Sequence, residues 1–299
     1  MGGRRWWLGA MVFGAVVAMA ATSTHLGTGQ EQGAVVLVAV PPSSAPVSPV
    51  VPTTSETSTP APTTIQAPEP SPVIEPAKPG NYLDVAGDIE LGVVVRDRQT
   101  GEDLVSQNPD QRFDSASLVK VLIALEALGT GSQDPAEVSR MLSTSDDDAA
   151  SRMWSTGGGN RIVTKWVKRL GLTGTAPPAD PNRWGDTQTT AADMAAVYLH
   201  LFESPDGDTV ISALDAMTDY GEDGFDQRFG IPAAADGRRW AVKQGWACCR
   251  NGRVLHTTGL VGDDQQYVVV VLTAQPASTT STAARAKVTE ITAALLTEL

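Results

Sequence analysis

Cysteine is nearly absent from this sequence: its 299 residues include two, the adjacent pair Cys248 and Cys249. A neighbouring pair cannot cross-link distant segments, so the fold does not depend on a disulfide framework. With no histidine pair nearby, the two thiols do not make a metal site either. In an exported protein they form a vicinal disulfide, pair with another molecule, or stay as two buried thiols. The residues alone leave these states open.

Positive charge and long hydrophobic runs are also limited. There are 22 Lys and Arg against 34 Asp and Glu, without a basic cluster, so we expect no nucleic-acid partner. The apolar run 6–21 is shorter than the roughly 20 residues of a membrane-spanning helix. It follows Arg4 and Arg5 and ends in a small-residue cleavage pattern at 18–20. We therefore expect residues 1–21 to be an export signal or an uncleaved membrane anchor.

Export implies a place in the cell envelope or outside the cell. No cysteine lies near the N-terminal segment, so a lipid-anchored N-terminal cysteine is excluded. Residues 22–80 are rich in Pro, Ser and Thr and too poor in apolar residues to fold, which predicts a disordered linker. That leaves residues 81–299 as the folded domain. This linker either holds the domain away from a membrane or is a plain spacer.

The folded domain has strand patterns at both ends and helical patterns between them. Strands are predicted over 89–96, 103–107, 240–246, 253–261 and 266–274. Helices are predicted over 118–128, 135–142, 149–154, 162–170, 194–201 and 284–295, with a loop from 202 through Gly230. We expect an α+β fold of two subdomains: an antiparallel sheet flanked by helices, with a helical subdomain inserted in the middle. A groove between sheet and helices would be a natural ligand site.

One predicted helix carries a lysine where a buried residue belongs. Asp114 or Ser115 is a suitable N-cap, and the run 118–128 is apolar on almost every face. Lys120 lies inside that run, and burial of an ammonium is costly unless it is paired or neutral. Ser117, three residues earlier, shares its helix face. The pair can therefore make an activated serine nucleophile, although a core helix whose lysine reaches the surface explains the same pattern.

Three polar motifs follow one another along the chain: Ser-Leu-Val-Lys at 117–120, Ser-Asp-Asp at 145–147 and Lys-Gln-Gly at 243–245. They resemble the Ser-x-x-Lys, Ser-x-Asn and Lys-Thr-Gly motifs of the serine β-lactamase and penicillin-binding protein superfamily. Segments 145–150 and 185–190 are most similar to class A β-lactamases. The resemblance covers about residues 85–299 and implies the β-lactamase/transpeptidase-like fold.

The resemblance implies a role for each motif residue. Ser117 would attack the substrate carbonyl, and Lys120 would hold or relay its proton. Ser145 would pass the proton to the leaving nitrogen, and Lys243 would supply positive charge. Backbone N–H groups of Ser117 and Trp246 would form the oxyanion hole. The family's substrates are β-lactams or D-Ala-D-Ala-type cell-wall peptides. We expect no cofactor, no metal ion and a monomer.

Substrate contacts are expected from Asp147, Gln244, Gly245 and Arg253, with Arg250 as an alternative to Arg253. Two of these residues depart from the family pattern. Asp147 replaces an asparagine, which removes an amide donor and adds negative charge. Gln244 replaces a threonine with a longer donor. These changes favour a catalytically inactive binding module of the cell envelope, whereas retention of both serines and both lysines favours an acyl-transfer enzyme.

The loop before the Gly-Asp-Thr segment at 185–187 also departs from class A enzymes. In those enzymes a glutamate in this loop activates the water that removes the acyl group. Here residues 171–184 contain no glutamate, and Asp180 is their only carboxylate. Asp180 is one methylene shorter, and the following Pro181 restricts its backbone. We therefore expect weak or no deacylation.

Other polar residues have ordinary explanations. His256 lies in a strand pattern, where a structural histidine is favoured over a Ser-His-Asp triad. His200 lies near a helix C-terminus, which suits a histidine. Acidic side chains at 146–148, 222, 223 and 226 are expected to be a helix cap and a surface loop, and less so a cation site.

Overall fold

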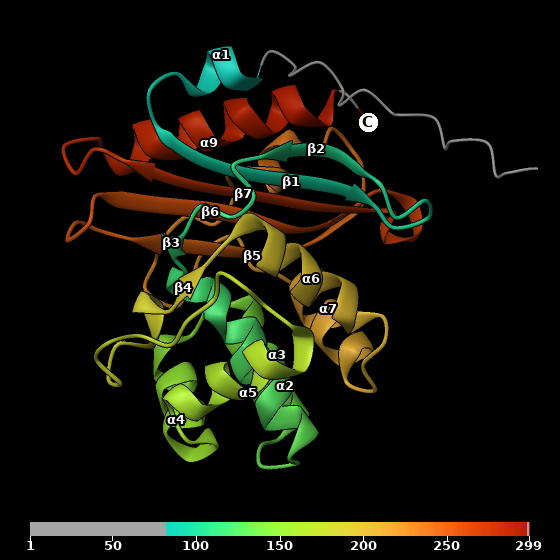
Figure 1. The fold of residues 1–299 in the computed structure, drawn as a ribbon, viewed down its shortest axis with the longest axis vertical. Helices are drawn as coiled ribbons and strands as arrows, with labels where there is room; N and C mark the ends of the chain where they lie inside the picture. Colours follow the sequence, from blue (N-terminus) through green and yellow to red (C-terminus); the bar gives the residue numbers. More distant parts are fainter. Residues whose placement is uncertain (1–81, 298) are drawn as a thin grey trace, which may run out of the picture. The chain divides into compact units, whose positions relative to one another are not determined.

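Five strands form one antiparallel sheet in the order β2-β1-β7-β6-β5 (Figure 1). The computed structural model describes residues 82–297 and residue 299. Its sheet consists of β1 (Glu90–Asp97), β2 (Asp103–Gln107), β5 (Trp240–Ala247), β6 (Arg253–Val261) and β7 (Tyr267–Gln275). Since β1 pairs with β7, the N-terminal and C-terminal strands meet inside one sheet. The predicted sheet is thereby confirmed.

The predicted export signal or anchor (1–21) and linker (22–80) lie outside the described residues, and both stay predictions. The first described element is the short helix α1 (Tyr82–Ala86), beside the predicted start of the folded domain. Within the part of the chain that the structure describes, no helix is long and apolar enough to cross a membrane.

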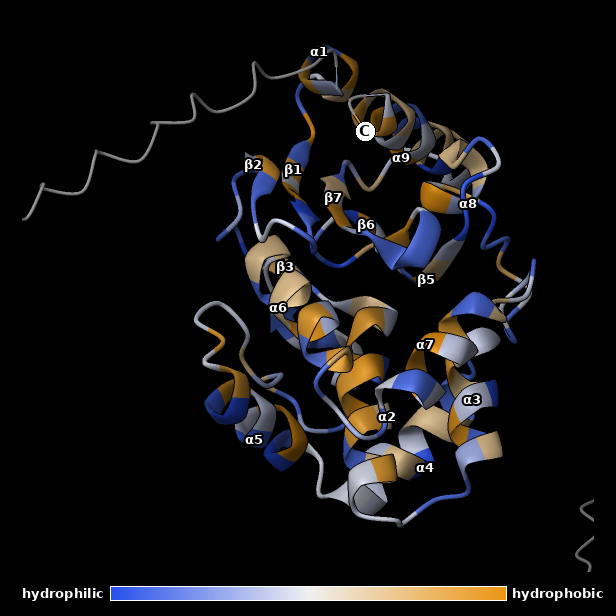
Figure 2. Ribbon diagram, turned by 90° about the vertical axis from the view of Figure 1, so that its right-hand side faces the viewer, coloured by the Kyte–Doolittle hydropathy of each residue, from blue (hydrophilic) through white to orange (hydrophobic). Residues whose placement is uncertain are grey.

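The sheet is covered on both faces, as the β-branched run of β7 predicts. Val268 and Val270 belong to the core shared with the central helices, whereas Val269 and Val271 pack in a second core. That second core lies under α9 (Ser281–Leu296), which also contacts α1. On the opposite face α6 (Ala191–Leu201) packs against β1 and β7 (Figure 2).

The remaining helices form the inserted helical subdomain. They are α2 (Lys120–Gly129), α3 (Pro135–Ser143), α4 (Asp147–Gly157), α5 (Asn160–Leu170) and α7 (Gly207–Asp215). The expected loop from 202 through Gly230 is wrong, because it contains α7 and is followed by α8 (Ile231–Ala234). Residues 204–207 are of types that favour turns, so the sequence does not indicate a helix start there. The helix forms because burial of Val210 and Leu214 in the main core stabilises it.

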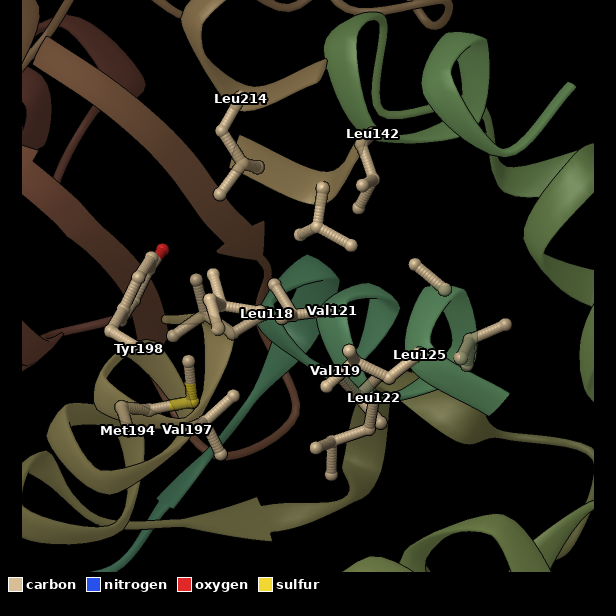
Figure 3. Close-up of a cluster of buried hydrophobic side chains, with 14 of the residues drawn as sticks. Leu118, Val119, Val121, Leu122, Leu125, Leu142, Met194, Val197, Tyr198 and Leu214 are labelled. Atoms are coloured by element: carbon tan, nitrogen blue, oxygen red, sulfur yellow. The ribbon is translucent and has the colours of Figure 1, made fainter. Parts of the chain in front are cut away.

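Helix α2 is the centre of the larger core. Leu118, Val121 and Leu125 are all at most 1% exposed and contact side chains from several surrounding helices (Figure 3). Leu142 and Leu214 approach from α3 and α7, and three α6 side chains lie on another side: Met194, Val197 and Tyr198. Full burial of an apolar side chain stabilises a fold by about 1.5–3 kcal/mol, so this packing holds α2 firmly in place.

Candidate active site

Ser117 lies in the 3-10 helix η1 (Ala116–Val119), which leads directly into α2. Ser115, one of the two predicted N-caps, occupies the N-cap position, although its side chain makes no cap hydrogen bond. Asp114 instead belongs to the short strand β3 (Phe113–Asp114). Ala116 has a φ of 47°, a left-handed conformation that is costly for alanine. Such strain often marks a functional site, and here it immediately precedes Ser117.

Lys120 is fully buried and lies among four oxygen atoms. Its Nζ is 2.9 Å from Ser117 Oγ, 3.1 Å from Ser145 Oγ and 2.6 Å from the Ser145 carbonyl oxygen. The fourth oxygen, Asp147 Oδ1, is 2.5 Å away. These contacts confirm that Lys120 is buried and within reach of both serines, and they exclude a side chain that extends into solvent.

Ser145 lies between the two lysines. It precedes α4, where Asp146 accepts a hydrogen bond from the Ala149 N–H as the N-cap. Ser145 has a φ of 55°, a second left-handed residue at this site. Lys243 Nζ, on β5, donates to Ser145 Oγ at 2.9 Å and to the Gln244 carbonyl oxygen at 2.9 Å. The result is a continuous hydrogen-bonded chain from Ser117 through Lys120 and Ser145 to Lys243.

Burial favours the neutral form of both lysines. It lowers the pKa of Lys120, although the neighbouring Asp147 carboxylate acts in the opposite direction. The pKa of Lys243 is lowered well below its usual value, first by complete burial and second by repulsion from Lys120. An ammonium has three N–H groups for four oxygens, whereas a neutral Lys120 has a lone pair that can accept the Ser117 hydroxyl proton. A neutral Lys120 is thus within hydrogen-bond distance of the Ser117 hydroxyl, and its role as a base stays a prediction.

A cavity of about 330 Å³ opens beside Ser117. Its wall is formed by η1, the start of α4, the end of β5 and the loop that contains η2 (Trp184–Asp186). The lining residues are Asp114, Ala116, Ser117, Asp147, Asn182, Arg183, Trp184, Gly185, Asp186, Trp246 and Ala247. Ser117 and Trp246 thus face one space, as two donors of an oxyanion hole must, and their role stays a prediction.

Gly245 allows β5 to approach η1 closely. A Cβ at this position would lie 3.0 Å from the Ser115 carbonyl oxygen and 3.1 Å from Leu118 Cγ. The backbone oxygen cannot move aside without moving the segment that holds Ser117. The lack of a side chain at Gly245 therefore lets β5 pack against the segment that holds Ser117; Gly245 itself is not among the residues that line the cavity, and its substrate contact stays a prediction.

Substitution Gly245→Ala is expected to destabilise the protein by about 1–3 kcal/mol, the usual cost of overpacking. Denaturant unfolding measures this change. The matched control is Gly129→Ala, at the end of α2, where the nearest atom to an added Cβ is 3.6 Å away. Equal stability of Gly245→Ala and wild type would show that the contact with η1 is loose.

Gln244 and Arg253 do not reach the cavity, which corrects their expected substrate contacts. Gln244 is completely buried, and its Nε2 donates to the Gln227 and Phe229 carbonyl oxygens. Arg253 donates to the Thr279 carbonyl oxygen and to Ser281 Oγ at the start of α9. The alternation of side chains along β5 turns Gln244 away from the cavity, and the position of α9 draws the Arg253 side chain to the start of that helix.

Arg250 does lie near the cavity, but it is engaged by another residue. It forms an ion pair with Asp186, which also accepts from Arg183 Nε at 2.7 Å. The two guanidinium groups hold the pKa of Asp186 below its usual value. Cys248 and Cys249, which directly precede Arg250, are paired as a vicinal disulfide. This is one of the states that the sequence left open.

The sequence interpretation missed the contribution of the 182–186 loop to the cavity wall. Trp184 lies over Lys120, with Nζ 4.9 Å from its ring centre, and its Nε1 donates to Ser151 Oγ. The sequence signal for this contribution was the pair Arg183 and Trp184, one large charged and one large aromatic side chain, in a loop rich in small polar residues. Asp180 is on this loop too, but it is exposed, bonds to Asn182 and does not line the cavity.

The remaining polar candidates are structural. His256 is buried; its Nδ1 accepts from the Thr273 N–H, so its Nε2 donates to the Asp114 carbonyl oxygen. Burial lowers the pKa of His256 to about 4, so it is neutral at pH 7. His200 packs against Trp166, away from the cavity. Among residues 82–297 and 299, no cluster of three or more His, Cys, Asp or Glu side chains could hold a metal ion.

Comparison with known proteins decides the family. The model of the beta-lactamase enzyme family matches residues 81–138 and 136–299. The chain belongs to this family. A relative from Mycobacterium tuberculosis, named "Putative lipoprotein LppW", is 39% identical over 215 residues, which cover 67% of each chain. Its Mycobacterium bovis counterpart matches equally well.

Solved structures of the family share the fold. A class A β-lactamase variant of the last common ancestor of Gram-negative bacteria has a TM-score of 0.59 at 19% identity, and the match covers 73% of this chain and 96% of that one. A mutant of PBP-A, solved as an acyl-enzyme complex with penicillin G, has a TM-score of 0.56 at 17% identity, with 73% and 96% covered. These similarities confirm the predicted fold of this family member.

Proposed function

We propose that this protein is an exported serine acyl-transfer enzyme that forms an acyl-enzyme on Ser117. The observation that carries the proposal is the hydrogen-bonded chain from Ser117 through Lys120 and Ser145 to Lys243. All four residues are at most 5% exposed and have matching motifs in the family. The substrates proposed are β-lactams or D-Ala-D-Ala-type peptides.

The arrangement suits a balanced acyl transfer. Neutral Lys120 accepts the Ser117 hydroxyl proton as Oγ forms a bond to the substrate carbonyl carbon. The carbonyl oxygen becomes an oxyanion beside the N–H groups of Ser117 and Trp246. Ser145 then gives its proton to the leaving nitrogen and receives one from Lys120, while the C–N bond breaks. The product is an ester on Ser117, and Lys120 is neutral again.

A specific observation favours the alternative of an inactive binding module. The Asp147 carboxylate contacts Lys120 directly and favours its charged form, which cannot accept a proton. Gln244 is also turned away from the cavity, so it gives a substrate no hydrogen bond. Burial opposes the effect of Asp147 on Lys120, and we therefore favour the enzyme.

Localisation at the cell envelope is part of this proposal. Its support is the N-terminal signal pattern and the lipoprotein name of the mycobacterial relatives. In this proposal any attachment to a membrane would use the N-terminal segment 1–21.

Incubation with penicillin G tests the proposal. Intact-protein mass is expected to rise by one penicillin per chain, and the adduct should map to the peptide that contains Ser117. Ser117→Ala should remove the adduct, whereas Ser155→Ala, an exposed serine on α4 outside the cavity lining, should retain it. An adduct that persists in Ser117→Ala, or no adduct in the wild-type protein, would contradict acyl transfer at this serine.

A further inference from the structure

The cavity beside Ser117 is lined by three carboxylates, and two of them are occupied. Asp114 accepts hydrogen bonds from Gln188 and Asn251, one on each carboxylate oxygen. Asp186 is held by the guanidinium groups of Arg183 and Arg250. The charge of Asp186 is therefore compensated by two cations, and each oxygen of Asp114 already accepts a hydrogen bond from a neutral amide.

Asp147 is the exception. Its Oδ1 contacts Lys120, but across the described residues no hydrogen bond reaches its Oδ2. The side chain is 68% exposed and lines the cavity. Its position in the first turn of α4, directly after the Asp146 cap, fixes where the carboxylate lies. An acceptor with negative charge is thus held open beside the nucleophile.

The location of Asp147 indicates which part of a substrate it would meet. Ser117 Oγ and Asp147 Oδ1 contact the same Lys120 Nζ, so the carboxylate is two hydrogen bonds from the attacking atom. In the proposed reaction Ser145 protonates the leaving nitrogen, and Lys243 is hydrogen-bonded to Ser145. This leaves Asp147 for a group on the acyl side, close to the reacting carbonyl.

We propose that Asp147 binds a free amino group on the acyl side of the substrate, so that the enzyme selects amine-bearing acyl donors over donors whose nitrogen is acylated. An amine offers several N–H donors, and its protonated form adds an attractive charge. An acylamino group offers one N–H and a carbonyl oxygen, which a carboxylate repels. This inference rests on the proposed acyl transfer at Ser117.

Two penicillins that differ at this nitrogen provide the test. 6-Aminopenicillanic acid carries a free amine, whereas penicillin G carries the same nitrogen as an amide; the ring and its carboxylate are identical. We would measure second-order acylation rates for both by intact mass and take the ratio of amine to amide. Asp147→Asn keeps the side-chain shape and is expected to lower that ratio by about tenfold or more, the worth of a charge-assisted hydrogen bond.

The ratio separates substrate selection from other effects of the substitution. Loss of the contact with Lys120 changes both rates through the same base, so it cancels in the ratio. The matched control is Asp148→Asn, which removes the same charge one residue away at an exposed position outside the cavity lining and should leave the ratio unchanged. Asp147→Ser, a residue suited to a helix start, provides a second folded variant with the same expected direction.

Each result bears on a different proposal. Adducts that form in all variants with an unchanged ratio in Asp147→Asn and Asp147→Ser would overturn amine selection and leave acyl transfer intact. An equal shift in Asp148→Asn would show a general charge effect and would also overturn it. Absence of any adduct with either penicillin in the wild-type protein would overturn the proposed function and this inference with it.

Discussion

Replacing Lys120 with methionine is expected to slow acylation of Ser117 by penicillin G about 10²–10⁴-fold, the usual contribution of a general base. Methionine has nearly the length of lysine and no charge, so it fills the same buried space in α2 without an unpaired ammonium. The loss should therefore appear in the reaction rate, with the fold retained. The control is Lys168→Met, an exposed position on α5, which should acylate at the wild-type rate.

The pH dependence of the rate separates a base from a merely structural lysine. Only the neutral amine accepts a proton, and burial lowers the pKa of Lys120. The wild-type acylation rate should accordingly rise as pH increases through this lowered pKa and level off above it. In Lys120→Met that rise should disappear. A rise that persists in the variant would assign the titration to another group, and an unchanged rate would remove Lys120 from the mechanism.

The positions of Ser117 and Lys120 were predictable because local rules decide them. A helix that is apolar on nearly every face is expected to be buried, so its lysine either finds buried partners or extends to the surface; the contacts of Lys120 decide for the first. Strands at both ends of the domain likewise predicted one sheet, since each needs hydrogen-bonded neighbours. The match of three motifs then predicted that Ser145 and Lys243 lie near Ser117, and hydrogen bonds through Lys120 join them to it.

Gln244 and Arg253 were not predictable in the same way, because tertiary packing decides where their side chains lie. A motif shows that Gln244 is near the site, but the carbonyl oxygens that attract its amide come from residues 227 and 229, in a loop with no sequence signal. Arg253 is drawn to the start of α9, whose position the sequence does not reveal. The pairing of Arg250 with Asp186 joins residues 64 positions apart and is equally invisible in sequence.

The acyl-enzyme is expected to accumulate and to decay slowly, because Asp180 and Asp186 are unsuited to activate the attacking water. Asp147, in contact with Lys120, favours the charged lysine, which cannot accept a proton. Asp180 is exposed, and its Oδ1 accepts from the Asn182 backbone and side chain on the outer turn of the loop. Asp186 lines the cavity, but two guanidinium groups lower its pKa, which makes it a weak base. Asp147 is tied to Lys120 through one oxygen. A base must come within about 3 Å of its water, so none of these carboxylates is well placed.

Removal of a general base costs roughly 10²–10⁴-fold in rate, so deacylation should be slower by a factor of this order than in a family member whose loop glutamate activates the water. Rapid-mixing mass spectrometry with penicillin G should show one equivalent of adduct that forms quickly and then persists. Asp180→Ala should leave the decay rate unchanged, since its carboxylate lies outside the cavity. Asn182→Glu, which brings a longer carboxylate to the cavity wall, should accelerate decay.

Rapid multiple turnover without an accumulating adduct would contradict this expectation, and the variants would then identify the base. Loss of turnover in Asp180→Ala would mean that the 171–184 loop moves inward when substrate binds. Turnover that survives Asp180→Ala but not Asp147→Asn would assign the water to Asp147, whose second oxygen faces no partner in the described residues. Turnover that survives both substitutions would assign the water to a neutral Lys120, the other group beside Ser117 able to accept a proton.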